Sequence, residues 1–186
     1  MSGRILDASW NILLTCGFEG FTFDRVARHA HIGKATIYSR FPGKTELMRA
    51  LLERRIAQRT EYLLAQGSDL PVEQAFRLRA SDTMSVLLAP DGIMTERLID
   101  WLDQETGQGR IVRARAYRNA IEAIAQSLRD AAADPERAAR LWFEGMIGHA
   151  KVAFHEGASS PADIERWAED YTRFFFAGLR KLDRTD

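Results

Sequence analysis

The sequence has little cysteine, no long apolar run and no excess of either charge. Its single cysteine, Cys16, cannot form a disulfide within the chain, which argues against a disulfide-stabilised secreted domain and favours the cytoplasm. No segment approaches the roughly 18 consecutive apolar residues of a membrane span. The first residues include Asp7 and Asn11 and lack a small-residue cleavage site, so we expect no signal peptide. These absences favour a soluble globular protein.

The charges that are present are unevenly distributed. The chain has 186 residues, of which 46% are apolar and 28% charged, which is sufficient for a core and too apolar for disorder. Residues 1–55 contain nine Lys and Arg against five Asp and Glu, a net charge of +4, and the remainder carries a net charge of −4. A basic N-terminal part on an acidic remainder indicates that only the N-terminal part meets a polyanion such as nucleic acid.

Glycine and proline occur in short clusters, including Pro-Asp-Gly at 90–92, and these clusters divide the chain into helix-length segments. Between them apolar residues recur every three or four positions, without the alternation typical of strands. Asp134 before Pro135, and Ser160 before Pro161, each pair a capping residue with proline at the first helical position. We therefore predict an all-α fold of about nine helices, over residues 3–16, 24–30, 34–40, 44–66, 71–89, 93–104, 109–132, 135–156 and 161–181.

The first three predicted helices are short and the later ones are long. This difference indicates a compact N-terminal head of three helices followed by a larger helical body. We place the head at residues 1–45 and the body at residues 46–186. The helix at 44–66 is expected to join them, because no linker separates it from the head.

The most informative segment is residues 21–47, FTFDRVARHAHIGKATIYSRFPGKTEL. Thr22 can cap a first short helix, a three-residue turn follows at 31–33, and a second short helix covers residues 34–40. Two short helices joined by a tight turn form a helix-turn-helix, whose second helix fits the major groove of DNA.

The residue types on the second helix suit contact with DNA. Ile37 and Phe41 are expected to face inward, which leaves a polar outer face. Basic side chains there can neutralise phosphates, hydroxyl groups can bond phosphates or base edges, and a small alanine allows close approach to a thymine methyl group. The start of the following helix favours a phosphate. The residues predicted on these grounds to bind DNA are Lys34, Ala35, Thr36, Tyr38, Ser39, Arg40 and Lys44.

Residues 4–52 resemble the DNA-binding domain of the tetracycline-repressor (TetR/AcrR) family. The resemblance is carried, in order, by RILDAS, CGFEGFTFDRVARHA and IGKATIYSRFPGKTELMRALL. It implies a transcription regulator, expected to be a repressor, that binds palindromic operator DNA as a homodimer and is released by a small ligand in the body. By position it implies DNA contacts from Thr22, Lys34, Thr36, Tyr38, Arg40 and Lys44, with Ala35 facing the bases.

Two residues depart from the family pattern. His31 stands where the family's turn usually has a glycine in a left-handed conformation, which histidine tolerates less well. Gly33 replaces the usual Ser or Thr cap of the second helix, and glycine caps almost as well. The first departure leaves open an alternative, a helical interaction module whose head no longer binds DNA.

The body contains many aromatic residues and methionines at helical spacing, and such residues are usually core. If the resemblance holds, some of them line a ligand pocket, since ligand sites are mostly apolar with few polar groups. The residues selected for this pocket are Met84, Trp101, Tyr117 and Trp142.

The last two predicted helices carry more aromatic bulk than one small core easily absorbs, and an exposed apolar patch indicates a partner. In the family the dimer forms from the final two helices. His149 remains open between a ligand contact and the interface. The residues implied at a homodimer interface are Gly145, Gly148, His149, Trp167, Tyr171, Phe174 and Phe175.

The sequence offers little for catalysis. It shows no paired carboxylates with a neighbouring histidine, no phosphate-binding glycine loop and no Cys/His ligand set. His29 and His31 lack the further partners that zinc needs. We therefore expect no enzyme activity, no cofactor and no metal, and a small helical enzyme is the least favoured alternative. The expected partners are operator DNA, a second copy of the chain and a small-molecule effector, with no membrane.

Overall fold

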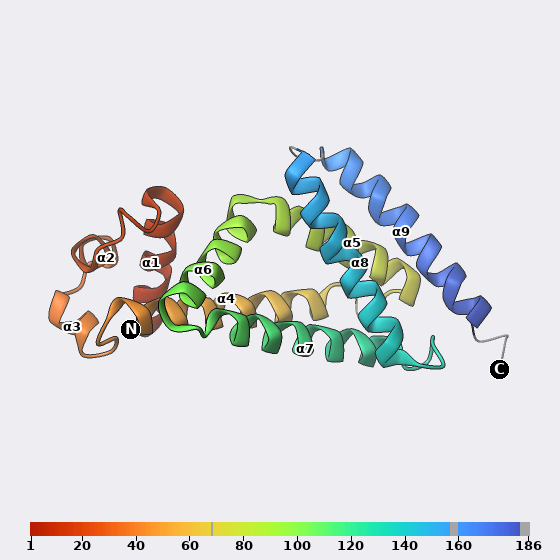
Figure 1. Ribbon diagram of the computed structural model, residues 1–186, viewed down its shortest axis with the longest axis horizontal. Helices are drawn as coiled ribbons and strands as arrows, with labels where there is room; N and C mark the ends of the chain where they lie inside the picture. Colours follow the sequence, from red (N-terminus) through yellow and green to blue (C-terminus); the bar gives the residue numbers. More distant parts are fainter. Residues whose placement is uncertain (68, 157–159, 183–186) are drawn as a thin grey trace. The chain divides into compact units, whose positions relative to one another are not determined.

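The computed structural model describes residues 1–67, 69–156 and 160–182, and over these ranges the chain forms nine helices and no strand (Figure 1). The predicted all-α fold of about nine helices is confirmed. Within the same ranges, no helix combines the length and apolarity needed to cross a membrane. The helices are α1 (Ser2–Cys16), α2 (Phe23–Ala30), α3 (Lys34–Tyr38), α4 (Lys44–Ala65), α5 (Val72–Leu88), α6 (Pro90–Thr106), α7 (Gly109–Ser127), α8 (Pro135–Glu156) and α9 (Pro161–Leu182).

The chain divides into two compact units, each with its own apolar core. The first unit comprises Met1–Ala57 and Pro90–Arg113, and the second comprises Gln58–Ala89 and Ala114–Asp186. Helices α4 and α7 each contribute residues to both units. These two units are defined by how the chain packs. The boundary predicted between residues 45 and 46 separates two functions instead, and it stays a prediction.

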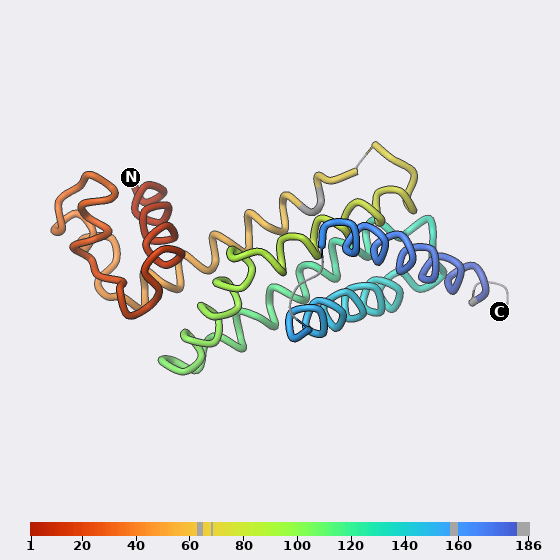
Figure 2. Tube along the Cα trace, turned by 90° about the horizontal axis from the view of Figure 1, so that it is seen from above, coloured from red at the N-terminus to blue at the C-terminus, as the bar shows by residue number. Residues whose placement is uncertain are grey.

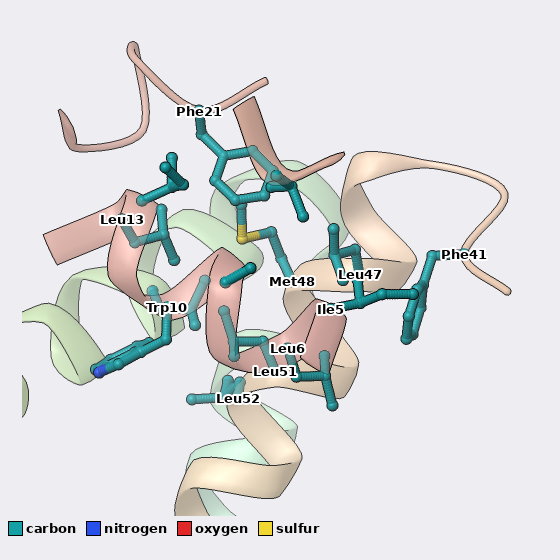
Figure 3. Packing of buried hydrophobic residues seen from close by; sticks show 14 of the residues in the cluster. Ile5, Leu6, Trp10, Leu13, Phe21, Phe41, Leu47, Met48, Leu51 and Leu52 are labelled. Carbon is teal, nitrogen blue, oxygen red and sulfur yellow. The ribbon is translucent and has the colours of Figure 1, made fainter. Parts of the chain in front are cut away.

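The core of the first unit is built on α1, α4 and α6. Ile5 and Leu13 of α1 lie against Leu47 and Leu51 of α4, and all four are almost completely buried (Figure 3). Leu98 of α6 belongs to the same cluster. These residues recur at helical spacing on one face of each helix. Burying each such side chain contributes about 1.5–3 kcal/mol, so this cluster is the main stabilising element of the unit.

In the second unit, α5 packs against both α8 and α9, and α8 and α9 run antiparallel beside each other (Figures 1 and 2). Phe76 of α5 is completely buried at the centre. Its ring meets Trp142 edge-on at 5.0 Å between ring centroids, and Phe176 at 5.5 Å. Edge-to-face pairs add to the stabilisation from burial alone, so these rings hold the three helices in one arrangement.

Two predicted helix starts are confirmed by their caps. The carboxylate of Asp134 accepts the backbone N–H of Arg137 at 3.0 Å, at the start of α8. The hydroxyl of Ser160 accepts the backbone N–H of Asp163 at 3.2 Å, while the Asp163 carboxylate accepts the N–H of Ser160 at the same distance. Both caps satisfy N–H groups that the first turn of a helix leaves without partners.

Two predicted boundaries are wrong. Residues 90–92 are not a break but the first turn of α6, because proline at the first helical position lacks only an N–H that the helix does not use. The helix predicted over 109–132 ends at Ser127. Beyond it the N–H of Leu128 bonds the carbonyl of Ala125 at 3.0 Å, a tighter three-residue step that turns the chain toward α8.

Candidate nucleic-acid interface

The first helix of the predicted helix-turn-helix is fixed at both ends. Thr22 has extended backbone angles, and its hydroxyl accepts the N–H of Arg25 at 3.2 Å, which confirms the predicted cap of α2. Val26 and Ala30 are buried on the inner side of this helix. At its end, the guanidinium of Arg4 donates to the carbonyl of Ala30 at 2.6 Å. These contacts hold α2 in place on the core of the first unit.

The turn between α2 and α3 is closed by His31 in the left-handed conformation, with φ 51° and ψ 51°. The N–H groups of His31 and Ile32 bond the carbonyls of Arg28 and Ala27, at 3.3 and 3.1 Å. This pair of bonds is a Schellman motif, in which the residue in the left-handed conformation is normally a glycine. Among the described residues, His31 is the one non-glycine with positive φ. The turn therefore keeps its geometry at the expense of backbone strain in His31.

Helix α3 presents a polar side and buries an apolar one. Gly33, in an extended conformation, precedes it as the predicted cap. Ile37 is completely buried and Phe41 nearly so, as predicted. Regular α-helix ends at Tyr38 rather than at residue 40, but the N–H of Phe41 still bonds the carbonyl of Ile37 at 2.8 Å. The segment thus remains a short rod anchored by two apolar side chains.

The polar side chains of α3 make few contacts. Tyr38 is 48% exposed, and its ring leans on Phe23 at 4.8 Å between centroids. The ammonium of Lys34 lies 2.9 Å from the carboxylate of Asp24, which raises the pKa of Lys34. Arg40 donates to the hydroxyl of Ser2 at 3.1 Å. Exposed aromatic, cationic and hydroxyl groups on one short helix can meet phosphates and base edges.

The remaining predicted DNA contacts differ in exposure. Ala35 is exposed, Thr36 is half-buried, and the hydroxyl of exposed Ser39 donates to the carbonyl of Thr36 at 3.0 Å. Lys44 is occupied within the first unit, where its ammonium donates to the carbonyl of Phe18 at 3.1 Å. It also lies 5.4 Å from the ring centre of Trp101. The structure therefore gives Lys44 a packing role, and its contact with DNA stays a prediction.

A polar cluster that the sequence did not predict joins α1, α4 and α6. The indole N–H of Trp10 donates to the carboxylate of Asp91 at 2.9 Å, and Arg55 forms an ion pair with the same carboxylate. The guanidinium of Arg55 also lies over the Trp10 ring, 4.4 Å from its centre. Burial lowers the pKa of Arg55. No local pattern pairs residues so far apart in the sequence, so spacing alone could not have found this cluster.

Comparison with known proteins agrees with this geometry. The model of the family described as bacterial regulatory proteins, tetR family, matches residues 5–51. The N-terminal part of this chain is thus similar to the tetR family. Over 93 residues it is 30% identical to the DNA-binding transcriptional repressor TetR of Mycobacteroides abscessus. The matched segment covers 48% of this chain and 49% of that protein. Over 67 residues it is 34% identical to YvkB, an HTH-type transcriptional regulator of Bacillus subtilis, which is 36% of this chain and 35% of that one.

These two matches span half or less of the relatives' length, whereas solved structures extend the likeness over the whole fold. A transcriptional regulator from Mesorhizobium loti, assigned to the TetR family, has a TM-score of 0.81 and 20% identity, and the match covers 95% of both chains. The regulator FadR from Bacillus subtilis, solved with stearoyl-CoA, has a TM-score of 0.64 and 14% identity over 96% of this chain and 100% of that one. At these identities the likeness shows the fold alone.

The second unit contains a small cavity of about 30 Å³. Of the four residues selected for a ligand pocket, Trp142 lines this cavity. Met84 is buried in the same core, and Tyr117 packs edge-on against Phe143 with 5.1 Å between centroids. Trp101 lies in the first unit, stacked on Phe18. The structure therefore does not group these four residues around one space.

Several residues implied at the dimer interface pack within the chain. The rings of His149 and Trp167 stack at 4.2 Å between centroids, and those of Trp167 and Tyr171 stack at 4.8 Å. Burial lowers the pKa of His149, while Glu156 raises it. The Tyr171 hydroxyl donates to the carbonyl of Trp142 at 2.7 Å, and burial raises the pKa of Tyr171 to about 12.

The remaining implied interface residues differ in what surrounds them. A Cβ atom on Gly145 would collide with the Tyr171 hydroxyl, so glycine at this position permits close packing of α8 and α9. Phe175 is buried in the core of the second unit. By contrast, Phe174 is 78% exposed and Gly148 faces open space.

Replacing His31 with glycine is expected to stabilise the protein. The change removes the cost of a left-handed histidine, partly offset by the greater freedom of glycine in the unfolded chain, and should raise the free energy of unfolding by about 0.5–1 kcal/mol. Urea unfolding followed by circular dichroism measures the effect. His29→Gly is the matched control, because His29 is helical, and it should lower the free energy of unfolding by roughly 0.5 kcal/mol. Destabilisation by His31→Gly would contradict the assigned strain.

Replacing Asp24 with asparagine is expected to strengthen DNA binding. The change removes an anion beside Lys34 and frees its ammonium, so the affinity for duplex DNA should rise about threefold or more and depend more steeply on salt. Fluorescence anisotropy over a range of salt concentrations measures both effects. Asp170→Asn, which alters an exposed carboxylate on α9 that pairs with Arg173, is the control and should change neither. Weaker binding by Asp24→Asn would mean that Asp24 positions Lys34 for its contact.

Proposed function

We propose that this protein is a transcription regulator that binds operator DNA as a homodimer and releases it when a small ligand binds the body. The observation that carries the proposal is the helix-turn-helix, in which Ile37 is buried while Lys34, Tyr38 and Arg40 of the same segment are exposed. A rigid helix with one polar side matches the major groove in size and chemistry. The relative from Mycobacteroides abscessus is named a repressor, and we propose repression here, in the cytoplasm.

A homodimer is supported by a face that the chain leaves uncovered on α8 and α9. This α8–α9 face comprises Leu141, Gly145, Gly148 and Val152 of α8 with Trp167, Tyr171, Phe174 and Gly178 of α9, residues that recur at helical spacing. Leu141, Val152 and Phe174 are exposed, and in the described part of the chain no atom lies within 4 Å of a Cβ atom built on Gly148 or Gly178. Apolar residues beside small ones permit close approach of a second copy, and burying them would be favourable.

A two-fold dimer determines the form of the operator. In such a dimer the same surface of each copy meets the other, so the two α3 helices are related by the same rotation axis. Recognition helices of helix-turn-helix dimers read two half-sites about 34 Å apart, one turn of DNA. We therefore propose a palindromic operator.

Release by a ligand is proposed as a population shift that acts through α4. This helix supplies Leu47 and Leu51 to the core of the first unit, and its Thr60 lines the cavity of the second. A ligand that binds better to a body conformation with α4 displaced would favour that conformation, and the recognition helices would then miss their half-sites. The relative FadR was solved with stearoyl-CoA bound, an example of a small ligand on the same fold.

Two alternatives carry less support. A degenerate head would be favoured by a distorted turn, but the turn at His31 keeps both hydrogen bonds of a Schellman motif. An enzyme has the least support, because the sequence shows no paired carboxylates with a neighbouring histidine and no phosphate-binding glycine loop. Salt-dependent DNA binding distinguishes a regulator from an interaction module, and turnover by purified protein would favour an enzyme.

The double variant Lys34→Ala, Tyr38→Ala is expected to abolish binding to the operator while the dimer stays folded. Both side chains are exposed on α3, so their removal takes away contacts with DNA and leaves buried Ile37 in place. Within the protein it removes the ring contact of Tyr38 with Phe23 and the ion pair of Lys34 with Asp24. The operator is first selected from a random DNA pool with the purified dimer, and binding is then measured by gel shift.

The matched control for this variant is Lys151→Ala, Tyr62→Ala, which removes a lysine and a similarly exposed tyrosine from the second unit. It should bind the operator as the unmodified protein does. Normal operator binding by the α3 variant would refute the assignment of this helix.

Replacing Phe174 with glutamate is expected to convert the dimer to a monomer. A charge at this exposed position would have to be buried, without a partner, in an interface built on the α8–α9 face. Sedimentation velocity at micromolar concentration measures the change. Phe154→Glu is the control, because Phe154 is also exposed but lies on the opposite side of α8 from Gly148 and Val152, and it should remain dimeric. A Phe174→Glu dimer as stable as the original would exclude this face.

A further inference from the structure

A groove on the second unit runs between α7 and the start of α8, beside the turn that joins these two helices (Figure 1). It has a volume of about 760 Å³, and its described lining residues all lie between positions 118 and 140, inside one unit. None of them belongs to the small cavity, to α3 or to the α8–α9 face. Ligand sites have volumes of roughly 300–1,000 Å³, so this α7–α8 groove has room for a small molecule.

Arginines from both helices line the α7–α8 groove. They are Arg118 of α7, Arg129 of the turn that follows it, and Arg137 and Arg140 of α8. All four are exposed, and Arg140 lies 3.5 Å from the carboxylate of Glu144. Over the part of the chain that the structure describes, the guanidinium groups of the other three make no ion pair and no hydrogen bond. These three groups are therefore available to an anion.

The carboxylates of the α7–α8 groove leave its charge net positive. Three acidic residues line it beside the four arginines, namely Glu122, Asp134 and Glu136. The carboxylate of Asp134 accepts the backbone N–H of Arg137 at 3.0 Å, as the cap of α8. In the described ranges, none of the three forms an ion pair with an arginine of the groove. Because residues 56–186 carry a net charge of −4, a net positive groove is a local exception that attracts anions to one place.

The same groove contains an apolar strip. Ile121 and Ala125 of α7 line it, together with Pro135 at the start of α8. Ala125 is buried, and the other two are half-buried. Arg118, Ile121, Ala125 and Arg129 recur at steps of three and four residues, which places them on one face of α7 and its continuation. A carbon skeleton can therefore lie on the strip while charged groups at its ends meet the arginines.

We propose that the α7–α8 groove binds a small organic polyanion, a molecule with two or more phosphate or carboxylate groups on a carbon skeleton. Guanidinium groups form paired hydrogen bonds with the oxygen atoms of both kinds of anion. Arg118 and Arg129 are about three helical turns apart, roughly 16 Å along the axis, so separate anionic groups use them better than a single one does. The site is additional to the small cavity, and it does not depend on the proposed binding of DNA.

Isothermal titration calorimetry of the full-length protein, without DNA and without divalent cations, tests the inference. The probes are ATP, which carries phosphates, and citrate, which carries carboxylates, with adenosine and acetate as their counterparts of low charge. At least one polyanion should bind, and its counterpart should bind at least tenfold more weakly. The tighter of the two polyanions identifies the preferred anionic group. Its affinity should fall as salt is raised, because salt screens exposed charges.

The double variant Arg118→Gln, Arg137→Gln should lower the affinity for that polyanion at least tenfold, because it removes one guanidinium group from each helix. Glu122→Gln should instead raise the affinity about two- to fivefold, because it removes a negative charge from the groove. Misfolding does not produce a gain in affinity. The Glu122 variant therefore keeps the test valid if circular dichroism shows that the double variant does not fold.

The matched control is Arg166→Gln, Arg173→Gln, which removes two exposed arginines of α9 outside the groove and changes the net charge equally. It should leave the affinity for the polyanion unchanged. Absence of binding by both ATP and citrate, unchanged affinity in the folded groove variant, or an equal loss in the control would each overturn the inference.

Two further measurements separate this site from the DNA-binding surface. Lys34→Ala, Tyr38→Ala should bind the polyanion normally, and loss of binding would place the anion on α3 and overturn the inference. The groove variant Arg118→Gln, Arg137→Gln should bind the operator as the unmodified protein does. Weaker operator binding by this variant, with no binding of either polyanion, would assign these arginines to DNA instead. Operator binding by the unmodified protein tests the proposed function independently of all these results.

Discussion

A helix of five residues has no stability of its own, so the function proposed for this protein depends on the burial of Ile37. Isolated helices this short do not form in water, because nucleation costs more than a few hydrogen bonds return. Here α3 is held from beneath by Ile37 and Phe41, and its start is set by the Schellman motif at His31. The polar side chains of α3 can therefore face solvent without loss of order. This separation of an apolar anchor from a polar surface makes a fixed DNA-reading element physically possible.

Helix α4 contributes side chains to both units of the molecule. Its first half supplies buried leucines to the core of the first unit, and its second half carries Arg59 and Tyr62, which both contact Asp82 of α5. A continuous helix transmits displacement along its axis better than a loop would. The guanidinium of Arg59 is largely buried at these contacts, and burial lowers its pKa. Helix α4 thus combines apolar packing in the first unit with polar contacts in the second.

Most of the helix-turn-helix could be predicted from the sequence, because its determinants are local. The cap at Thr22 and the inward Ile37 follow from residue type and spacing within a few turns, and the left-handed position at His31 was implied by the family resemblance. The packing of the body could be predicted less well from the sequence. Trp101 and Trp142 look alike as aromatic residues in amphipathic helices, yet one packs in the first unit and the other lines a cavity in the second. Helical periodicity shows which residues face inward but not which interior they share.

Polar groups in the interior were the hardest to predict. Arg79 occurs in a segment that also contains exposed Arg77, and the spacing of charges alone does not show which guanidinium turns inward. Asp91 lies in a Pro-Asp-Gly cluster typical of a turn, yet it is the acceptor that joins Trp10 and Arg55. Such contacts bring together residues far apart in the sequence. They become visible only when the fold is known, and they cluster where helices from different parts of the chain meet.

The net charge of the head does not equal the number of cations that can contact DNA. Residues 1–55 carry a net charge of +4, but several of the cations included in it bond groups of the same unit. Arg4 donates to a helix end, Arg54 pairs with Asp7, Arg55 pairs with Asp91 and Lys44 donates to a backbone carbonyl. Counterion release depends on cations that reach phosphates, not on the total in the sequence. Lys34 and Arg40 of the α3 segment are bonded to Asp24 and Ser2 in the same way, so the net charge of residues 1–55 overstates the number of cations without a contact inside the unit.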